Sequence, residues 1–188
     1  MAHTDRRPVA DQREAWQEYV QKKHRAMWRP TSYISLDRAT PVGEPRGYRT
    51  QQPSLASVRK NTRDTGQWDE GSSKQQKEDR AAEKRVAQWI LESGATTVQQ
   101  VHEVDRSMPD FLVDGSTPVE VKRVVSSTSI QKQARRGLKQ SSCVVMDARE
   151  ASISLEEAQE GMRAAIRNYG GDLDRITVIG DDFVLSWP

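Results

Sequence analysis

Apolar residues recur at helical spacing in three stretches of this chain after residue 73. The first stretch has its apolar side chains at i, i+4, i+7 and i+8, and it stops before Gly94, which suits a left-handed helix cap. The second follows Ser126-Ser127-Thr128, which are suited to cap its N-terminus, and the third opens on a capping box formed by Ser154 and Glu157. The three helices are therefore expected over residues 74–93, 129–140 and 155–169.

Shorter apolar runs bounded by turn residues predict β-strands. Two of them flank Asp114-Gly115, which is a strong signal for a tight hairpin turn, and a second hairpin is expected around Gly180-Asp181-Asp182. The strands are expected over residues 97–104 as an edge strand, 111–113, 119–121, 141–147 as a buried central strand, 175–179 and 183–187. From residue 74 the order is α-β-β-β-α-β-α-β-β, which predicts an α/β domain with a mixed central sheet and helices on both faces.

The first 73 residues show a different pattern. Residues 11–28 have amphipathic spacing and predict a helix that carries Trp16 and Trp28, which would either dock on a partner or pack on the rest of the chain. Prolines and glycines then break any periodicity over residues 30–75, so we expect a tether with short extended patches such as 32–36. The chain is thus expected to divide into an N-terminal helix and arm, residues 1–73, and a domain, residues 74–188.

Charged residues on the first hairpin are the strongest candidates for chemistry. Glu120 and Lys122 are two residues apart on one strand and share a face, whereas Val119 and Val121 point to the other face, into a core. Asp110 opens the neighbouring strand, so two carboxylates and an ammonium converge on one side of the sheet. Like charges held this close need compensation, and a divalent cation is the usual one.

These residues resemble a known nuclease motif. Pro109-Asp110, nine further residues and then Glu120-Val121-Lys122 are similar to the PD-(D/E)xK motif, and Glu83 has the spacing of the first-helix Glu in many such nucleases. Over residues 75–187 the chain resembles most the C-terminal tRNA-nuclease toxin domain of contact-dependent growth inhibition (CdiA-type) proteins. This resemblance implies a restriction-endonuclease-like core and a metal-dependent nuclease that hydrolyses phosphodiester bonds in RNA, with tRNA favoured.

The resemblance also implies roles for single residues. Asp110, Glu120 and the backbone carbonyl of Val121 would bind Mg²⁺ or Mn²⁺, hard cations that prefer oxygen ligands. Lys122 would orient or deprotonate the attacking water or stabilise the charge on the phosphate, and Glu83 would support the metal through a water or hold Lys122. If the substrate is RNA, its 2′-hydroxyl is an alternative nucleophile that needs no metal.

A cationic stripe lies on the predicted helix that follows the motif and consists of Lys132, Arg136 and Lys139. Its members are well placed to hold a phosphate backbone, although a solvated helix face explains such a run equally well. Arg123 and Thr128, between the strand and this helix, would touch substrate or only cap the helix. The candidate nucleic-acid-binding residues are Arg123, Thr128, Lys132, Arg135, Arg136 and Lys139.

Composition narrows the other possibilities. The 188 residues carry a net charge of +2 with a mean hydropathy of -0.84, and residues 1–70 hold 13 Lys/Arg against 9 Asp/Glu, so only a local basic patch or the arm would attract nucleic acid. One cysteine, Cys143, excludes an intrachain disulfide and is expected in the core, and three scattered histidines exclude a zinc finger. His102 is expected in a structural or surface role. No signal peptide or membrane span is recognisable, so action on intracellular nucleic acid in the cytoplasm is expected, with delivery or virion association left open.

Two other functions stay open at this stage. One is a DNA endonuclease of a phage or mobile element, because the motif does not distinguish RNA from DNA. The other is a non-catalytic nucleic-acid-binding or virion-associated protein that retains the fold. A neutralising partner of the immunity type, if there is one, would be acidic and would cover the site.

Overall fold

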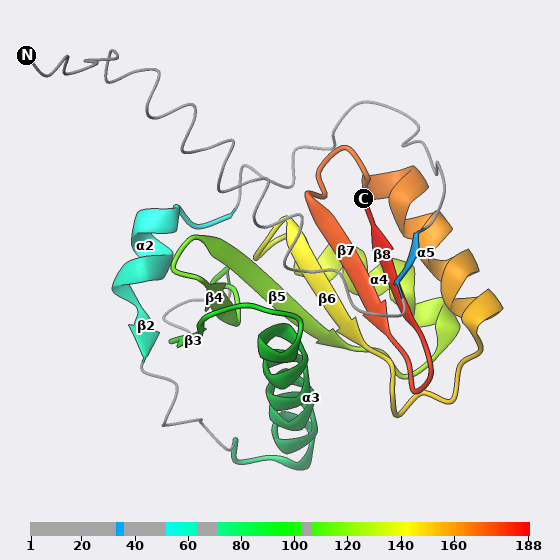
Figure 1. The fold of residues 1–188 in the computed structure, drawn as a ribbon, viewed down its shortest axis with the longest axis horizontal. Coiled ribbons are helices and arrows are strands. Elements are labelled where there is room, and N and C mark those ends of the chain that lie inside the picture. The colour runs from blue at the N-terminus through cyan, green and yellow to red at the C-terminus, as the bar shows by residue number, and fades with distance from the viewer. Residues whose placement is uncertain (1–32, 36–51, 64–70, 103–106) are drawn as a thin grey trace, which may run out of the picture.

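A computed structural model describes residues 33–35, 52–63, 71–102 and 107–188, which form one eight-stranded sheet with helices on both faces (Figure 1). The strands are β1 Tyr33–Ser35, β2 Thr62–Arg63, β3 Val98–Val101, β4 Phe111–Val113, β5 Thr117–Arg123, β6 Cys143–Asp147, β7 Arg175–Ile179 and β8 Val184–Trp187. The helices are α2 Leu55–Lys60, α3 Lys74–Glu92, α4 Ile130–Gly137 and α5 Leu155–Tyr169, with a 3₁₀ turn, η2, at Ser127–Ser129. From α3 onward the order of helices and strands is the predicted one, and the α/β class with a mixed sheet is confirmed.

The sheet order is β1-β8-β7-β6-β5-β4-β3-β2. Strands β5, β6 and β7 are parallel, and antiparallel pairs extend the sheet on both sides. Parallel neighbours need a crossover connection, which α4 supplies between β5 and β6 and α5 supplies between β6 and β7. The predicted central position of β6 is therefore confirmed.

Two apolar cores lie on the two faces of the sheet. On one face, α3 packs Val86 and Ile90 against Val119 and Val121 of β5. On the other face, α4 and α5 cover the central strands with fully buried side chains such as Ile130, Ala134, Leu138, Met162 and Ile166. Strand β5 thus lies between two helical layers, which fixes the direction of every side chain along it.

The β4–β5 hairpin carries the motif and is held by its turn. Asp114 and Gly115 both adopt positive φ, 48° and 64°, as the Asp-Gly signal predicts. The Asp114 Oδ1 atom accepts hydrogen bonds from the backbone N–H groups of Thr96 and Thr97, each at 2.8 Å, so the turn is tied to the segment that enters β3. The predicted hairpin is confirmed, and its register is fixed.

The segment predicted to be a tether differs in part from the expectation. Strand β1 adds in parallel to β8, which confirms the extended patch, while α2 and β2 add to the opposite edge, where β2 pairs with β3. The tether prediction is therefore wrong at residues 54–63, and β3 is an interior strand instead of an edge strand. Backbone pairing holds β1 and β2 in the sheet. The hydropathy pattern of such short strands does not reveal that pairing.

Two side chains also anchor this segment on the domain. Arg59 donates from Nε to the Gly115 carbonyl at 2.8 Å, and Gln52 donates from Nε2 to the Leu138 carbonyl at 2.8 Å. The helix predicted over residues 11–28, with its tryptophans, lies outside the described residues. The division at residues 73 and 74 stays a prediction.

The start of α4 also departs from the expectation. Ser126-Ser127-Thr128 do not cap it through a side chain; instead η2 precedes the helix, and the Ser129 hydroxyl donates to the Ser126 carbonyl at 2.6 Å. The 3₁₀ turn supplies acceptors for the first backbone N–H groups of this segment, because Ser129 donates to the Ser126 carbonyl and Ile130 donates to the Ser127 carbonyl. Cys143, expected in the core, is half-buried at the start of β6. No helix among the described residues is long and apolar enough to cross a membrane.

Candidate active site

Strand β5 brings the two central side chains of the motif to one face. Glu120 is completely buried, and its Oε1 atom is in direct contact with the Nζ atom of Lys122, whose side chain keeps 22 % of its exposure. Asp110 stands just before β4, and its Oδ2 atom accepts a hydrogen bond from the backbone N–H of Val121 at 2.8 Å. The hairpin therefore assembles the predicted Asp110, Glu120 and Lys122 at one point.

Glu83 joins this point from α3. Its side chain is 9 % exposed, although a helix Glu is usually solvated, and its Oε2 atom lies 2.6 Å from an Nη atom of Arg80. Its charge acts on both Asp110 and Glu120. The structure thus places all four predicted catalytic side chains together, and it adds Arg80.

Crowding and burial shift the acid–base behaviour of the site. Burial and the neighbouring Asp110 raise the pKa of Glu83 to about 8, even though Arg80 opposes the shift. Burial also raises the pKa of Asp110, and burial with Asp110 beside it raises the pKa of Glu120 well above its usual value. Burial alone would lower the pKa of Lys122, but the Glu120 and Asp110 carboxylates outweigh it and raise that pKa, so Lys122 is an ammonium at neutral pH.

These four side chains line a cavity of about 710 Å³ between α3 and α4. Val121 also lines it, with Arg123, Arg136 and Lys139, so three of the predicted nucleic-acid-binding residues reach the cavity. The other three are exposed and lie outside its lining, namely Thr128, Lys132 and Arg135. Of the cationic stripe, Arg136 and Lys139 therefore line the cavity that holds the acidic centre, and Lys132 does not.

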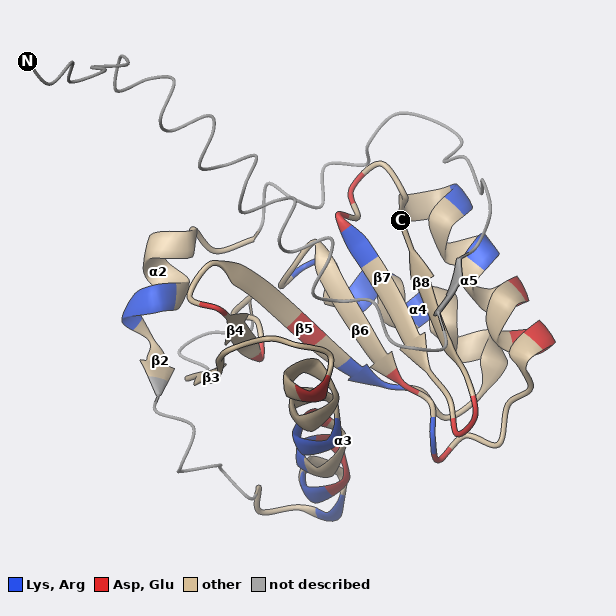
Figure 2. Ribbon diagram, viewed as in Figure 1, with Lys and Arg blue, Asp and Glu red and all other residues tan. Residues whose placement is uncertain are grey.

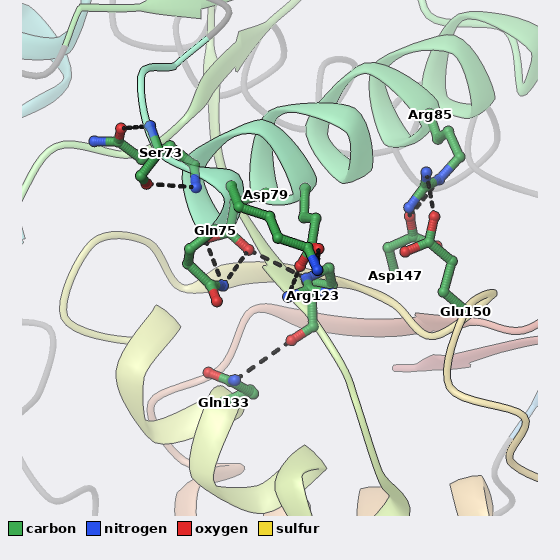
Figure 3. Close-up of polar contacts among 11 residues, drawn as sticks. Ser73, Gln75, Asp79, Arg85, Arg123, Gln133, Asp147 and Glu150 are labelled. Carbon is green, nitrogen blue, oxygen red and sulfur yellow. Dashed lines mark hydrogen bonds and ion pairs between the residues drawn. The ribbon is translucent and has the colours of Figure 1, made fainter.

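Arg123 is engaged by carboxylates of α3. Its guanidinium lies 2.7 Å from Glu78 and 3.3 Å from Asp79, and its carbonyl accepts a hydrogen bond from Gln133 of α4 at 3.3 Å (Figure 3). Asp79 also lines the cavity. Arg123 consequently links β5 to both helices that form the cavity walls.

Several cavity residues escaped the sequence interpretation. Arg80 precedes Glu83 by three positions, a helical spacing that would have indicated the pair. Gln133 lies on α4 and Gln140 lies in the turn after it, and Gln140 donates from Nε2 to the Met108 carbonyl at 3.0 Å. Both side chains are uncharged amides, which a pattern of charged residues does not reveal. Acidic and basic residues are interleaved along α3 (Figure 2). The charge pattern of this helix therefore does not indicate which of its sides faces the cavity.

The residues at the centre fit a divalent cation in one respect and limit it in another. The Glu120 Oε2 atom is buried and accepts no hydrogen bond, so an acceptor is available beside Asp110 in a site with excess negative charge. Within the described residues, no group of three or more His, Cys, Asp or Glu side chains could hold a metal ion. The donor set is therefore that of an ion that takes one or two carboxylates and keeps several waters, as Mg²⁺ does.

The raised pKa of Glu83 leads to a test of stability against pH. The folded protein retains a proton that the unfolded chain releases near its usual pKa of 4.5, so this contribution to stability is complete below that pH and is lost as pH rises through about 8. We expect the free energy of unfolding to fall between about pH 4.5 and pH 8, by at most about 1.4 kcal/mol per pH unit for one proton. Glu83→Gln should flatten this fall, as measured by urea unfolding at several pH values.

The matched control is Glu92→Gln, an exposed position on the same helix. It should leave the pH dependence as in the unsubstituted protein. An equal slope in the unsubstituted protein and Glu83→Gln would show that the Glu83 carboxyl is ionised in the folded state throughout this range.

Comparison with known proteins gives one finding for this region. Residues 107–184 match a family model described as the contact-dependent growth inhibition CdiA C-terminal domain. The match covers less than half of the chain; it includes Asp110, Glu120 and Lys122 but not Glu83 on α3. No curated protein and no solved structure matches the chain. The family match supports a toxin domain of this type for residues 107–184.

Proposed function

We propose that this protein is a metal-dependent endonuclease of the PD-(D/E)xK type that hydrolyses phosphodiester bonds in RNA and acts as a toxin-like effector. One observation carries the proposal: the buried carboxylate of Glu120 and the half-buried carboxylate of Asp110 meet the Lys122 ammonium inside a cavity that also holds cationic side chains from α3 and α4. A cluster of like charges with little access to solvent destabilises a fold, and carboxyl groups with shifted pKa values in a cavity are typical of active sites.

Each side chain has a role that its surroundings support. Asp110, Glu120 and the Val121 carbonyl would hold Mg²⁺ or Mn²⁺, which when bound would polarise a phosphoryl oxygen and lower the pKa of a water. Lys122 remains protonated, so it stabilises the negative charge that grows on the phosphate, and this favours charge stabilisation over its alternative role as a base. Glu83, whose pKa is raised to about 8, mostly holds its proton at neutral pH, so it would support the metal through a water or hold Lys122.

The substrate assignment rests on resemblance and on the cavity walls. The likeness to tRNA-nuclease toxin domains favours tRNA, and Arg136 and Lys139 supply the charge that a phosphate backbone needs beside the acidic centre. Such a toxin would act on nucleic acid in the cytoplasm of the cell it enters. Its neutralising partner would be an acidic immunity-type protein that covers the cavity, and residues 1–73 are a further candidate for partner docking.

The first test is a cleavage assay on two substrates. We expect purified protein to fragment total tRNA in the presence of Mg²⁺ or Mn²⁺, and we expect EDTA and the variant Asp110→Asn to abolish the fragments. The control Asp181→Asn changes an exposed aspartate in the β7–β8 loop and should cleave normally. Asn keeps an acceptor for the Val121 N–H, so Asp110→Asn separates charge from the local fold.

The other outcomes assign the rival functions. Nicked plasmid DNA with intact tRNA would replace the RNA substrate with DNA and favour a phage or mobile-element endonuclease. Binding of nucleic acid that weakens with salt, without cleavage of either substrate, would contradict the enzyme and leave a binding protein that retains the fold. Cleavage of tRNA in EDTA would contradict the metal and point to the 2′-hydroxyl as nucleophile.

A further inference from the structure

Arg80 is the cationic residue that α3 contributes to the cavity lining, and it lies beside the acidic centre. Its guanidinium is 2.6 Å from Glu83 Oε2, its side chain is 23 % exposed, and it contributes to the cavity lining. Its positive charge also acts on Asp110. It therefore stands where the cavity opens onto the carboxylates that would act on a phosphodiester.

The other cations of the cavity have different settings. Lys122 contacts Glu120 at the floor, and Arg123 is held by Glu78 and Asp79. Arg136 on α4 and Lys139 in the turn after α4 are exposed on the opposite wall. A phosphate that reaches Asp110 and Glu120 would thus pass between Arg80 on one side and these two cations on the other.

The chemistry of the guanidinium suits this place. It carries N–H donors in a planar fork whose geometry matches phosphate oxygens. An arginine that already lies beside a buried carboxylate is oriented before substrate arrives, so little side-chain entropy is lost on binding. Both features favour recognition of a phosphate over a purely structural ion pair.

We propose that Arg80 binds the non-bridging oxygens of the phosphodiester in this cavity and is a further catalytic residue, while its contact with Glu83 orients it. The inference rests on the proposed function. The competing explanation is that Arg80 acts only through Glu83 and never touches substrate. The two explanations differ in one quantity, the number of phosphate contacts that depend on Arg80.

The salt dependence of binding measures that number without any need for cleavage. In the background of Glu120→Gln, end-labelled tRNA would be titrated by fluorescence anisotropy over a series of KCl concentrations. A single phosphate contact contributes about 0.7–0.9 to the slope of log affinity against log salt concentration. We expect Arg80→Gln to reduce the slope by about this amount and Arg80→Lys to keep it.

A charge-matched control comes from the same helix. Lys77 is exposed and does not line the cavity, so Lys77→Gln should leave the slope unchanged. Thermal unfolding of each variant would confirm the fold, and Arg80→Gln combined with Glu83→Gln removes the partner charge if the single variant is unstable. With the Glu120 side chain restored, Arg80→Lys should cleave more slowly than the unsubstituted protein, because an ammonium lacks the fork.

Two outcomes would overturn the inference in distinguishable ways. An unchanged slope in Arg80→Gln, with a reduced slope in Arg136→Gln, would show that Arg80 makes no phosphate contact while the site still binds nucleic acid. The absence of salt-dependent binding in both the unsubstituted protein and Glu120→Gln would overturn the proposed function itself.

Discussion

Replacing Glu120 with Gln is expected to reduce phosphodiester cleavage by about 10²–10³-fold or more, with no loss of stability. The side chain keeps its shape but loses the charge that would bind the cation and that pairs with Lys122, and removal of one preorganised electrostatic group from an active site typically costs this much. The free energy of unfolding should stay equal or rise, because the change removes one buried charge beside Asp110 and Glu83.

The measurement pairs initial cleavage rates with urea unfolding at the same pH. Glu160→Gln, at an exposed position on α5, should leave both quantities unchanged. A large loss of stability in Glu120→Gln would mean that Glu120 is a structural partner of Lys122. Full activity in this variant would remove Glu120 from the site altogether.

Replacing Asp147 with Ala is expected to destabilise the fold by about 3–5 kcal/mol. Asp147 ends β6, is 1 % exposed, and accepts a hydrogen bond from Nε of Arg85 at 2.8 Å (Figure 3). It accepts another from Nε of Arg149 at 2.7 Å. Removal of this carboxylate leaves two half-buried guanidinium groups without their shared partner. It also removes one contact between α3 and the sheet, so the position of Glu83 and Arg80 should be held less firmly, and cleavage should fall with stability.

Glu150→Ala is the matched control for this network. Glu150 binds the same Arg85 at 2.8 Å but keeps 52 % of its exposure, and an exposed ion pair contributes about 0–1 kcal/mol. Chemical unfolding of both variants compares a buried and an exposed partner of one arginine. Equal effects of the two substitutions would show that burial does not govern the strength of this network.

The sequence predicted those features that depend on near neighbours in the chain. The periodic apolar faces of α3, α4 and α5 and the Asp114-Gly115 hairpin are local patterns, and the structure has them where expected. The meeting of Asp110, Glu120 and Lys122 follows from the same hairpin, because a strand places residues i and i+2 on one face.

Features that depend on distant pairing escaped prediction. Strands β1 and β2 have three and two residues, which is too short a pattern to reveal that they add to the sheet. The division of the cationic stripe was hidden as well, since only packing on the sheet shows that Arg136 faces the cavity and Lys132 does not. Arg123 looked like a free ligand for phosphate because its partners, Glu78 and Asp79, are distant in sequence.

The position of β1 has a consequence for how the chain reaches its fold. Tyr33 pairs with Val184, about 150 residues later, whereas the contacts of β4 with β5 close a short loop. Bringing distant segments together has an entropic cost that grows with loop length, so short-range pairs form first and such long-range contacts are slow. During synthesis on the ribosome, β1 therefore emerges early but has no partner strand until β8 has been made, and the order of translation is the reverse of the order of assembly at that edge of the sheet.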